Sequence, residues 1–313
     1  MSSVLAFVAL FVVAAQANAA IITVGAGGGY DFATIQAAID AAGSGDTIRV
    51  ANGTYFVGEG NYIDMTKVDR LTLQAEHVGG AVIDGQDSYT AAVEIDNGDI
   101  IRGFWLRNVS CGIEERYGDR NPNTGPWIAE RCIVSDTEVA ITINDIGSTV
   151  GNGVVRNCTV YQTDIQGIGT NDGNTLDIFN TLIVKAANLG EAAVVEGHSN
   201  RVSIDFSNIY GCRQNYDNAW GHLVIGEHMY YSDPLFVDPA AGDFRLQAGS
   251  PLVDLGIPID GLWGGYEGAA PDIGAYEIPE PTTSALLALA GPVLLAKRRS
   301  KNRHKRRSGF SRA

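Results

Sequence analysis

The chain has 313 residues, of which 45% are hydrophobic and 8% aromatic, a composition typical of a folded protein and not of a disordered one. Nine of its 22 Lys and Arg lie in residues 297–313, which contain no Asp or Glu, so residues 1–296 carry 13 cations, 36 carboxylates and a formal charge of −23. Such a body repels polyanions: we expect no nucleic-acid partner, and an anionic polysaccharide would need a local Arg/Lys cluster or bridging Ca²⁺.

The first 19 residues have the pattern of a secretory signal peptide. An apolar run from Val4 to Ala15 precedes Ala17-Asn18-Ala19, a small-x-small site for signal peptidase. The mature chain would then begin at Ala20. Because no Lys or Arg precedes the apolar run, a buried first strand is the alternative.

A strand at Ile21–Val24 and a helix at Phe32–Ala42 are predicted next. Asp31 is a plausible N-cap of this helix and Gly43 a plausible C-terminal stop. Strand, glycines and helix also suggest a dinucleotide-binding turn, but Tyr30 stands where the third Gly of that fingerprint is needed. One helical face carries the apolar residues Phe32, Ile35, Ile39 and Ala42.

The middle of the chain repeats a short β-favouring run that follows a Gly- or Asn-rich turn. The steps between equivalent positions are 28, 26, 23 and 26 residues, which indicates stacked units of one or a few strands each. Leucine-rich repeats are the main alternative, but their Leu/Asn spacing is absent. A parallel β-helix is therefore predicted, with these positions in one column: Phe104, Cys132, Cys158, Thr181 and Ser207.

A resemblance supports this prediction. The segment Gly28–Ala42, followed by Gly45–Val50 and Asn52–Tyr55, resembles the N-terminal entry of right-handed β-helix proteins related to pectinesterases and pectate lyases. The resemblance implies an all-β, single-stranded right-handed parallel β-helix solenoid, forming one domain over residues 20–277, with the helix as its N-terminal cap.

A second resemblance covers the end of the body. Four motifs in order are similar to the C-terminal segment of choice-of-anchor Q proteins, which are secreted bacterial β-helix proteins with interchangeable sorting signals. The motifs are Asp233–Pro239, Gly242–Leu246, Gly249–Gly256 and Pro271–Glu277.

Residues 278–313 resemble the PEP-CTERM sorting signal of Gram-negative bacteria. Pro279, Glu280 and Pro281 precede the apolar stretch 284–296 and a basic tail. The stretch is shorter than the roughly 20 residues of a stable span, so it suits a transient membrane stop. The resemblance implies transient inner-membrane insertion, cleavage by an exosortase and display at the cell surface or release outside the cell. A nucleic-acid-binding arm is the competing interpretation of the tail.

Catalytic elements of the resembled enzymes are incomplete. Asp205-Phe206 and Gln162-Thr163-Asp164 are similar to pectinesterase elements, but the order differs and no Arg-x-Trp follows. Asp205 is alternatively a solvated outward residue. Arg102, Glu130 and Arg156 lie two residues before their repeat positions, so we expect a structural ladder of alternating charge in preference to an active site.

Two excursions, at residues 114–127 and 213–222, combine aromatic and polar residues as sugar binding requires. If the protein is an enzyme, the candidate catalytic residues are Arg116, Asp119 and Asp205. The alternative is that the tryptophans only pin their loops to the flank. The predicted substrate-binding residues are Trp127, Tyr216, Trp220 and His222.

The sequence leaves the state of the cysteines and the identity of any metal ligand open. Cys132 and Cys158, on adjacent turns, are compatible with a disulfide or with inward free thiols, of which residue preference favours the thiols. No metal ligand is assigned; Ca²⁺ is what the resemblance implies for a lyase. The prediction is an exported β-helix protein that binds polysaccharide in the envelope or biofilm matrix, with a polysaccharide lyase or pectinesterase-like esterase as the alternative.

Overall fold

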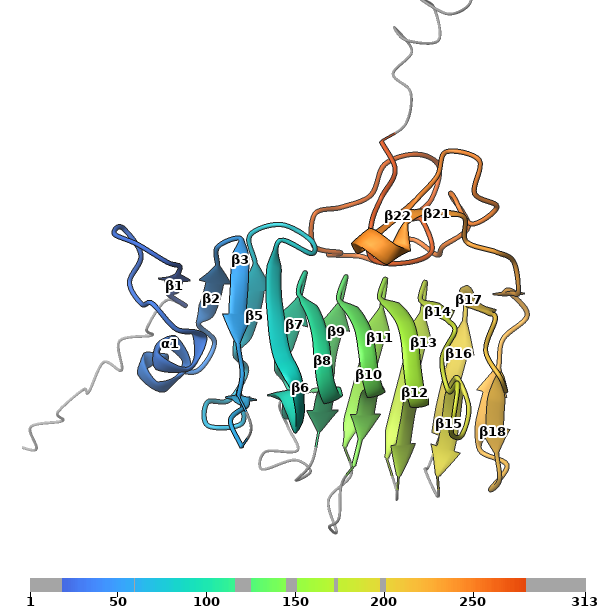
Figure 1. Ribbon diagram of the computed structural model, residues 1–313, viewed down its shortest axis with the longest axis horizontal. Helices are drawn as coiled ribbons and strands as arrows, with labels where there is room; N and C mark the ends of the chain where they lie inside the picture. Colours follow the sequence, from blue (N-terminus) through green and yellow to red (C-terminus); the bar gives the residue numbers. More distant parts are fainter. Residues whose placement is uncertain are drawn as a thin grey trace, which may run out of the picture.

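The computed structural model describes residues 19–58, 60–115, 125–144, 151–171, 174–197 and 201–279. In this part of the chain the strands stack as a parallel β-solenoid, whose turns follow one another along the long axis (Figure 1). This confirms the predicted all-β, parallel-solenoid fold. None of the described helices is long and apolar enough to span a membrane.

Two sheets run the length of the solenoid. The first contains, in order, β1 (Ile21–Val24), β2 (Thr47–Val50), β5 (Thr72–Ala75), β7 (Ile100–Arg102), β9 (Trp127–Glu130), β11 (Asn152–Arg156), β13 (Thr175–Phe179), β16 (Arg201–Asp205) and β19 (Leu223–Ile225). The second contains β3 (Gly53–Phe56), β6 (Ala81–Glu94), β8 (Trp105–Glu115), β10 (Ile133–Ile143), β12 (Thr159–Asn171), β14 (Leu182–Val184), β17 (Ser207–Tyr210) and β20 (Met229–Tyr230), with β4 (Ile63–Asp64), β15 (Val194–Gly197) and β18 (Tyr216–Asn218) beside it.

The predicted column of repeat positions is present. Trp105 pairs with Ile133, Ile133 with Thr159, Thr159 with Leu182 and Leu182 with Asn208, which places the preceding residues of these five in one register. These are Phe104, Cys132, Cys158, Thr181 and Ser207, and each is 0% exposed.

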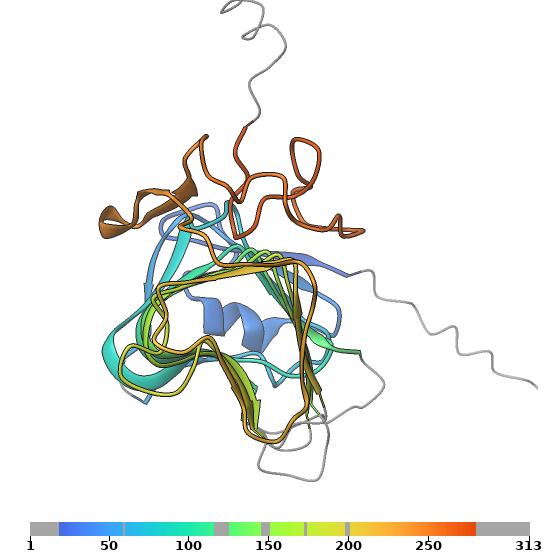
Figure 2. The same cartoon turned by 90° about the vertical axis from the view of Figure 1, so that its right-hand side faces the viewer.

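The N-terminal helix is shorter than predicted. Helix α1 spans Ile35–Ala41, and its N-cap is Thr34, whose hydroxyl accepts a hydrogen bond from Ala37 N. Asp31 instead accepts from the backbone and hydroxyl of Thr23 and fixes the preceding turn. Ile35 and Ile39 are buried in the first turns of the core, and α1 lies at the N-terminal end of the stack, as expected (Figures 1 and 2).

The C-terminal segment, residues 232–279, packs along one flank of the solenoid (Figures 1 and 2). It contains β21 (Phe236–Asp238), a 3₁₀ turn η1 (Pro239–Ala241) and β22 (Asp243–Leu246), and β21 and β22 pair antiparallel. A second apolar cluster joins this segment to the outward residues of β10, β12 and β14. Its buried members are Ile133, Tyr161, Leu182, Val184, Phe236, Phe244, Leu246, Leu252, Ile273 and Ala275.

Candidate functional site

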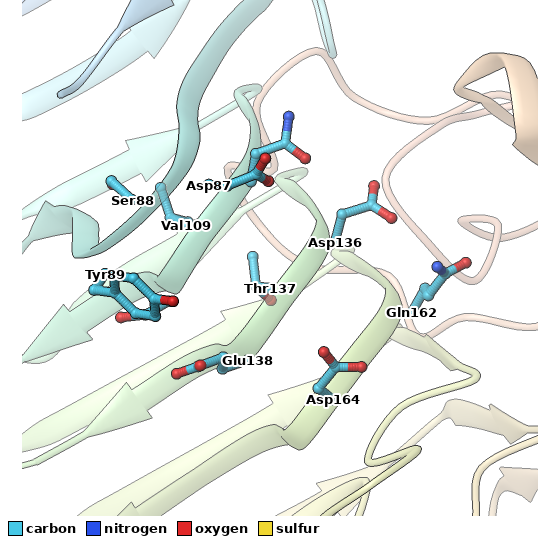
Figure 3. A pocket seen from close by; sticks show the side chains of 11 residues that line it. Asp87, Ser88, Tyr89, Val109, Asp136, Thr137, Glu138, Gln162 and Asp164 are labelled. Atoms are coloured by element: carbon cyan, nitrogen blue, oxygen red, sulfur yellow. The ribbon is translucent and has the colours of Figure 1, made fainter. Parts of the chain in front are cut away.

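A groove of about 340 Å³ opens on a flank that the C-terminal segment leaves uncovered (Figure 3). Strands β6, β8 and β10 each contribute three consecutive residues to it, and β12 contributes two that flank Thr163. The lining consists of Asp87, Ser88, Tyr89, Asn108, Val109, Ser110, Asp136, Thr137, Glu138, Gln162 and Asp164.

Corner residues in a left-handed backbone conformation shape one wall of the groove. Thr137 pairs with Val109 on one side and Thr163 on the other, so the residues before them, Asp136, Asn108 and Gln162, form one column. Their φ values lie between 55° and 58°. Gln86 and Asp87, at the corner of the preceding turn of the solenoid, have similar φ values of 54° and 63°. Asn and Asp tolerate this conformation better than most residues, which explains a polar column at a sharp bend.

A bulge then changes the spacing of the next column. Thr137 pairs with Thr163, whereas Val139 pairs with Gln166, so β12 holds one extra residue here. A bulge bends its strand and re-aims the side chains near it. Glu138 of β10 and Asp164 of β12 both lie within this irregular stretch, and both line the groove.

Asp84 orders the wall from behind. Its carboxylate accepts hydrogen bonds from Gln86 N at 3.0 Å, Asn108 Nδ2 at 3.0 Å and Arg107 Nε at 2.9 Å. Burial opposes ionisation of this carboxyl, but the three donors and the Arg107 charge outweigh it and lower the pKa of Asp84. The amide of Asn108 is therefore held at the groove in a fixed orientation.

The groove is acidic. Its described lining contains four carboxylates and no Lys or Arg: Asp87, Asp136, Glu138 and Asp164, all exposed. Among the described residues, no group of three or more His, Cys, Asp and Glu is placed to hold a metal ion.

Two further lining residues add to its binding capacity. Tyr89, with 80% of its surface exposed, presents an aromatic ring. Thr137 is only 5% exposed, and its Oγ1 has no hydrogen-bond partner in the described structure. A buried hydroxyl without a partner costs about 1–3 kcal/mol, and this one lies in the groove lining.

Trp127 is a correction to the sequence prediction. It was expected on a surface excursion, but its side chain is 0% exposed in the main core. The neighbouring strand makes room for it with Gly153, where an added Cβ would lie 2.3 Å from the indole ring. Trp127 therefore packs inside the solenoid and presents no surface to a ligand.

The other predicted binding residues lie around β18 and the following loop, apart from the groove lining. Trp220 is 54% exposed, and its backbone N–H donates to the buried Glu196, whose Oε1 lies 3.7 Å from His222 Nδ1. Tyr216 is half-buried against the core and its hydroxyl lies 2.9 Å from that of Tyr231. Replacement of Tyr216 is thus expected to lower stability, unlike that of an exposed ring. Their role in binding stays a prediction.

Asp205 lies at the end of β16, away from the groove lining. Its Oδ1 accepts hydrogen bonds from Phe206 N and His228 N, both at 2.9 Å, and the His228 ring stacks on Phe206 with centroids 4.1 Å apart. This arrangement holds the turn before β20. A catalytic role for Asp205 stays a prediction, and Arg116, Asp119, Glu280 and Pro281 lie outside the described residues.

The predicted charge ladder is a structural element. Arg156 forms an ion pair with the fully buried carboxylate of Glu130, which also accepts from Trp263 N at 2.6 Å. Arg102 donates twice to Gln74 Oε1 and lies over the Trp263 ring. The ladder therefore anchors the C-terminal segment.

The four cysteines carry free thiols, as residue preference favoured. Cys132 and Cys158 point into the core, where their thiols contact backbone carbonyls. Burial raises the pKa of the Cys158 thiol well above its usual range, so it is poorly suited to thiolate chemistry.

The comparisons with known proteins are sparse. No family model and no curated protein matches the chain. Four solved chains match it in structure; one is the crystal structure of pectate lyase Pel9A, with 14% sequence identity and a TM-score of 0.41, covering 83% of this chain and 96% of that one. At this identity the likeness concerns the fold alone.

Most groove residues were not singled out from the sequence. Gln162 and Asp164 drew attention only for a partial likeness to an esterase element, and Asp136 and Glu138 received none. The available signal was the single polar residue at the same place in successive repeats, Asn108, Asp136 and Gln162, each two residues after an inward apolar residue of the strand.

Proposed function

We propose that the protein binds a polysaccharide in the flank groove as an exported protein of the envelope or extracellular matrix. The observation that carries the proposal is the groove itself, a polar channel of about 340 Å³ with an exposed aromatic ring, supported by four strands of one rigid sheet. Sites built on strands hold side chains more precisely than sites built on mobile loops.

The repeat of the solenoid suits a polymeric ligand. The lining comes from successive strands, and neighbouring strands lie roughly 4.8 Å apart. Asn108, Asp136 and Gln162 therefore present a row of side-chain acceptors and amides along the axis. A chain of similar units can meet a similar polar group at each step, which a compact small molecule cannot.

The chemistry of the lining suits sugars. The ring of Tyr89 offers an apolar face on which the C–H face of a sugar can pack. Carboxylates accept hydrogen bonds from hydroxyl groups, and the amides of Asn108 and Gln162 both donate and accept. Together these groups provide the mixture of stacking and directional hydrogen bonds that a glycan requires.

A carbohydrate-active enzyme on the same fold is the second candidate. One observation favours it: Glu138 and Asp164 line the same groove from adjacent strands. Two neighbouring carboxylates can serve as acid and base in cleavage of a glycosidic bond. The release of new reducing ends or unsaturated products from a glycan panel, with and without Ca²⁺, decides between binding and catalysis.

The binding test is the Tyr89→Ala variant on a panel of immobilised and soluble polysaccharides. We expect its dissociation constant to rise about fivefold, because a stacked ring contributes on the order of 1 kcal/mol. Tyr266→Ala is the matched control, since Tyr266 is also exposed but belongs to the C-terminal segment. Equal affinities for the native protein and the Tyr89 variant would remove the groove from the proposal.

For export, we propose that residues 1–19 and the tail that follows Pro279 are removed during sorting. The signal-like ends of the sequence support this, and so does the fold: Ile278 N still donates to Asp272 at 2.8 Å. A cut beyond Pro279 would thus leave the packed body whole. Intact mass of the protein recovered from the cell surface is the measurement, and a full-length mass would contradict the proposal.

A further inference from the structure

We propose that the groove selects a glycan that carries positive charge, such as a polymer of amino sugars with free amines, and rejects polyuronates. This proposal rests on the proposed binding function and adds the substrate class. It follows from the charge of the lining, the contacts of two neighbouring cations and the distribution of the carboxylates along the axis.

The described lining contains four carboxylates but no Lys or Arg to neutralise them. Asp136 and Glu138 come from β10, Asp164 from β12 and Asp87 from the turn within β6. Carboxylates are acceptors only, whereas an ammonium group has three donors and no acceptor. An amine on the ligand therefore complements this lining, while a ligand carboxylate would meet like charge.

Two described cations that are close to the lining in the strand register are already engaged elsewhere. Arg107 is paired with Asp84 behind the wall and lies over the Trp105 ring at 4.7 Å. Lys185 lies on the next turn of the solenoid, beside Gln162. Its ammonium group is 3.2 Å from the Tyr161 hydroxyl and lies over the Tyr161 ring. Neither contributes positive charge to the lining.

One buried group marks the groove as more than a patch of surface acids. Thr137, 5% exposed, belongs to its lining, and the Thr137 hydroxyl is buried beneath the groove surface without a hydrogen-bond partner in the described structure. A hydroxyl can accept from an amine or a sugar hydroxyl and can also donate. Thr137 lies between Asp136 and Glu138, at the centre of the labelled side chains (Figure 3).

The carboxylates are spread over several strands. Asp87, Asp136 and Asp164 belong to three different strands, and neighbouring strands are roughly 4.8 Å apart. Such a row fits a polymer with a charge on each unit better than one compact cation. The groove thus favours a polysaccharide that carries an amine on each repeating unit.

The experiment compares three oligosaccharides of similar length by calorimetry: a glucosamine oligomer at a pH at which its amines are protonated, its neutral N-acetylated form, and an oligogalacturonate with Ca²⁺ or with chelator. We expect the cationic oligomer to bind at least tenfold more tightly than the neutral one, and the uronate not to bind. The double variant Asp136→Asn/Glu138→Gln should reduce that preference to about threefold or less.

The matched control is Asp260→Asn/Glu267→Gln, which removes the same charge from exposed positions of the C-terminal segment. It should keep the full preference; an equal loss in both double variants would mean that the overall charge, not the groove, attracts the ligand. Equal binding of cationic and neutral oligomers, or tightest binding of the uronate, overturns the charge selection but leaves polysaccharide binding standing. No binding of any oligomer overturns both. Unchanged melting curves confirm that each variant is folded.

Discussion

The covered flank and the open flank of the solenoid are built on the same kind of corner but use it differently. On the covered flank, Asn157 and Asn180 have φ values of 50°, and Asn180 donates to Ile257 O and accepts from Ile257 N, at 2.9 and 2.8 Å. On the open flank, Asp136 and Gln162 have nearly the same backbone conformation, with φ of 55° and 58°, but their side chains face solvent in the groove.

The difference teaches how a repeat fold separates stability from function. A corner side chain that is hydrogen-bonded to another segment of the same chain contributes to folding and is unavailable to a ligand. A corner side chain in an open groove contributes little to folding and keeps its hydrogen-bonding capacity. The second apolar cluster marks the first kind of flank, and the groove marks the second.

The largest effect should follow from breaking the ion pair that anchors the covered flank. Arg131, whose side chain is 5% exposed, pairs with Glu277 at 3.0 Å and also donates to Gly265 O. Arg131→Met leaves the Glu277 carboxylate buried without its partner, so at pH 8 the free energy of unfolding should fall by about 3 kcal/mol or more. Urea unfolding measures the change.

The control for this variant is Arg245→Ala. Arg245 pairs with Asp243 at 2.5 Å, but its side chain is 60% exposed. Exposed pairs contribute about 0–1 kcal/mol, so this variant should unfold almost like the native protein. Similar losses in both variants would show that the buried pair is not special and would weaken the contrast between the flanks.

The sequence was sufficient for the repeat and for the direction of its strands. The column from Phe104 to Ser207 could be predicted because each turn must stack its inward residues on the same residues of the next. The ladder of Arg102, Glu130 and Arg156 was predictable for the same reason, since alternating charges at one register position face each other across neighbouring strands.

The groove and the interior position of Trp127 could not be predicted in the same way. The groove depends on the bulge between Thr137 and Val139 and on which flank the C-terminal segment covers, and both are tertiary properties. Trp127 follows a charged excursion in the sequence, but its environment is decided by Gly153 on the neighbouring strand. Local composition therefore assigned it to the wrong side of the strand.

The stability that the covered flank provides should also depend on pH. Burial raises the pKa of Glu277 to about 7, against the opposing effects of the Asp272 N–H and of Arg131. The folded state thus binds a proton that the unfolded state has released between about pH 4.5 and 7. The associated stability is fully present below about pH 4.5 and is lost as the pH rises through about 7, by about 2–3 kcal/mol in total.

Urea unfolding of the native protein and of Glu277→Gln at several pH values checks this sign. The Gln variant should lose the part of the decline that Glu277 contributes, so its stability should fall less steeply with pH than that of the native protein. Some decline should remain, because burial also raises the pKa of Asp99 to about 8, which acts in the same direction. A native protein that becomes more stable from pH 5 to pH 8 would contradict the prediction.

The smallest effect is expected on the open flank. There the change in the free energy of unfolding should be near zero and slightly stabilising, whereas the variants of the covered flank are destabilising. Asp136→Asn/Glu138→Gln removes two like charges from one strand beside Asp164, and exposed substitutions change stability by roughly 0.5 kcal/mol or less. Because like charges on neighbouring strands repel, the change should be slightly stabilising.

Asn180→Ala at the covered corner should instead cost about 2 kcal/mol, since both of its hydrogen bonds to Ile257 are lost in a buried site. Parallel unfolding curves for the two variants test the comparison directly: if the groove variant is the less stable one, the groove carboxylates serve the fold, and the separation of a stabilising flank from a binding flank is wrong.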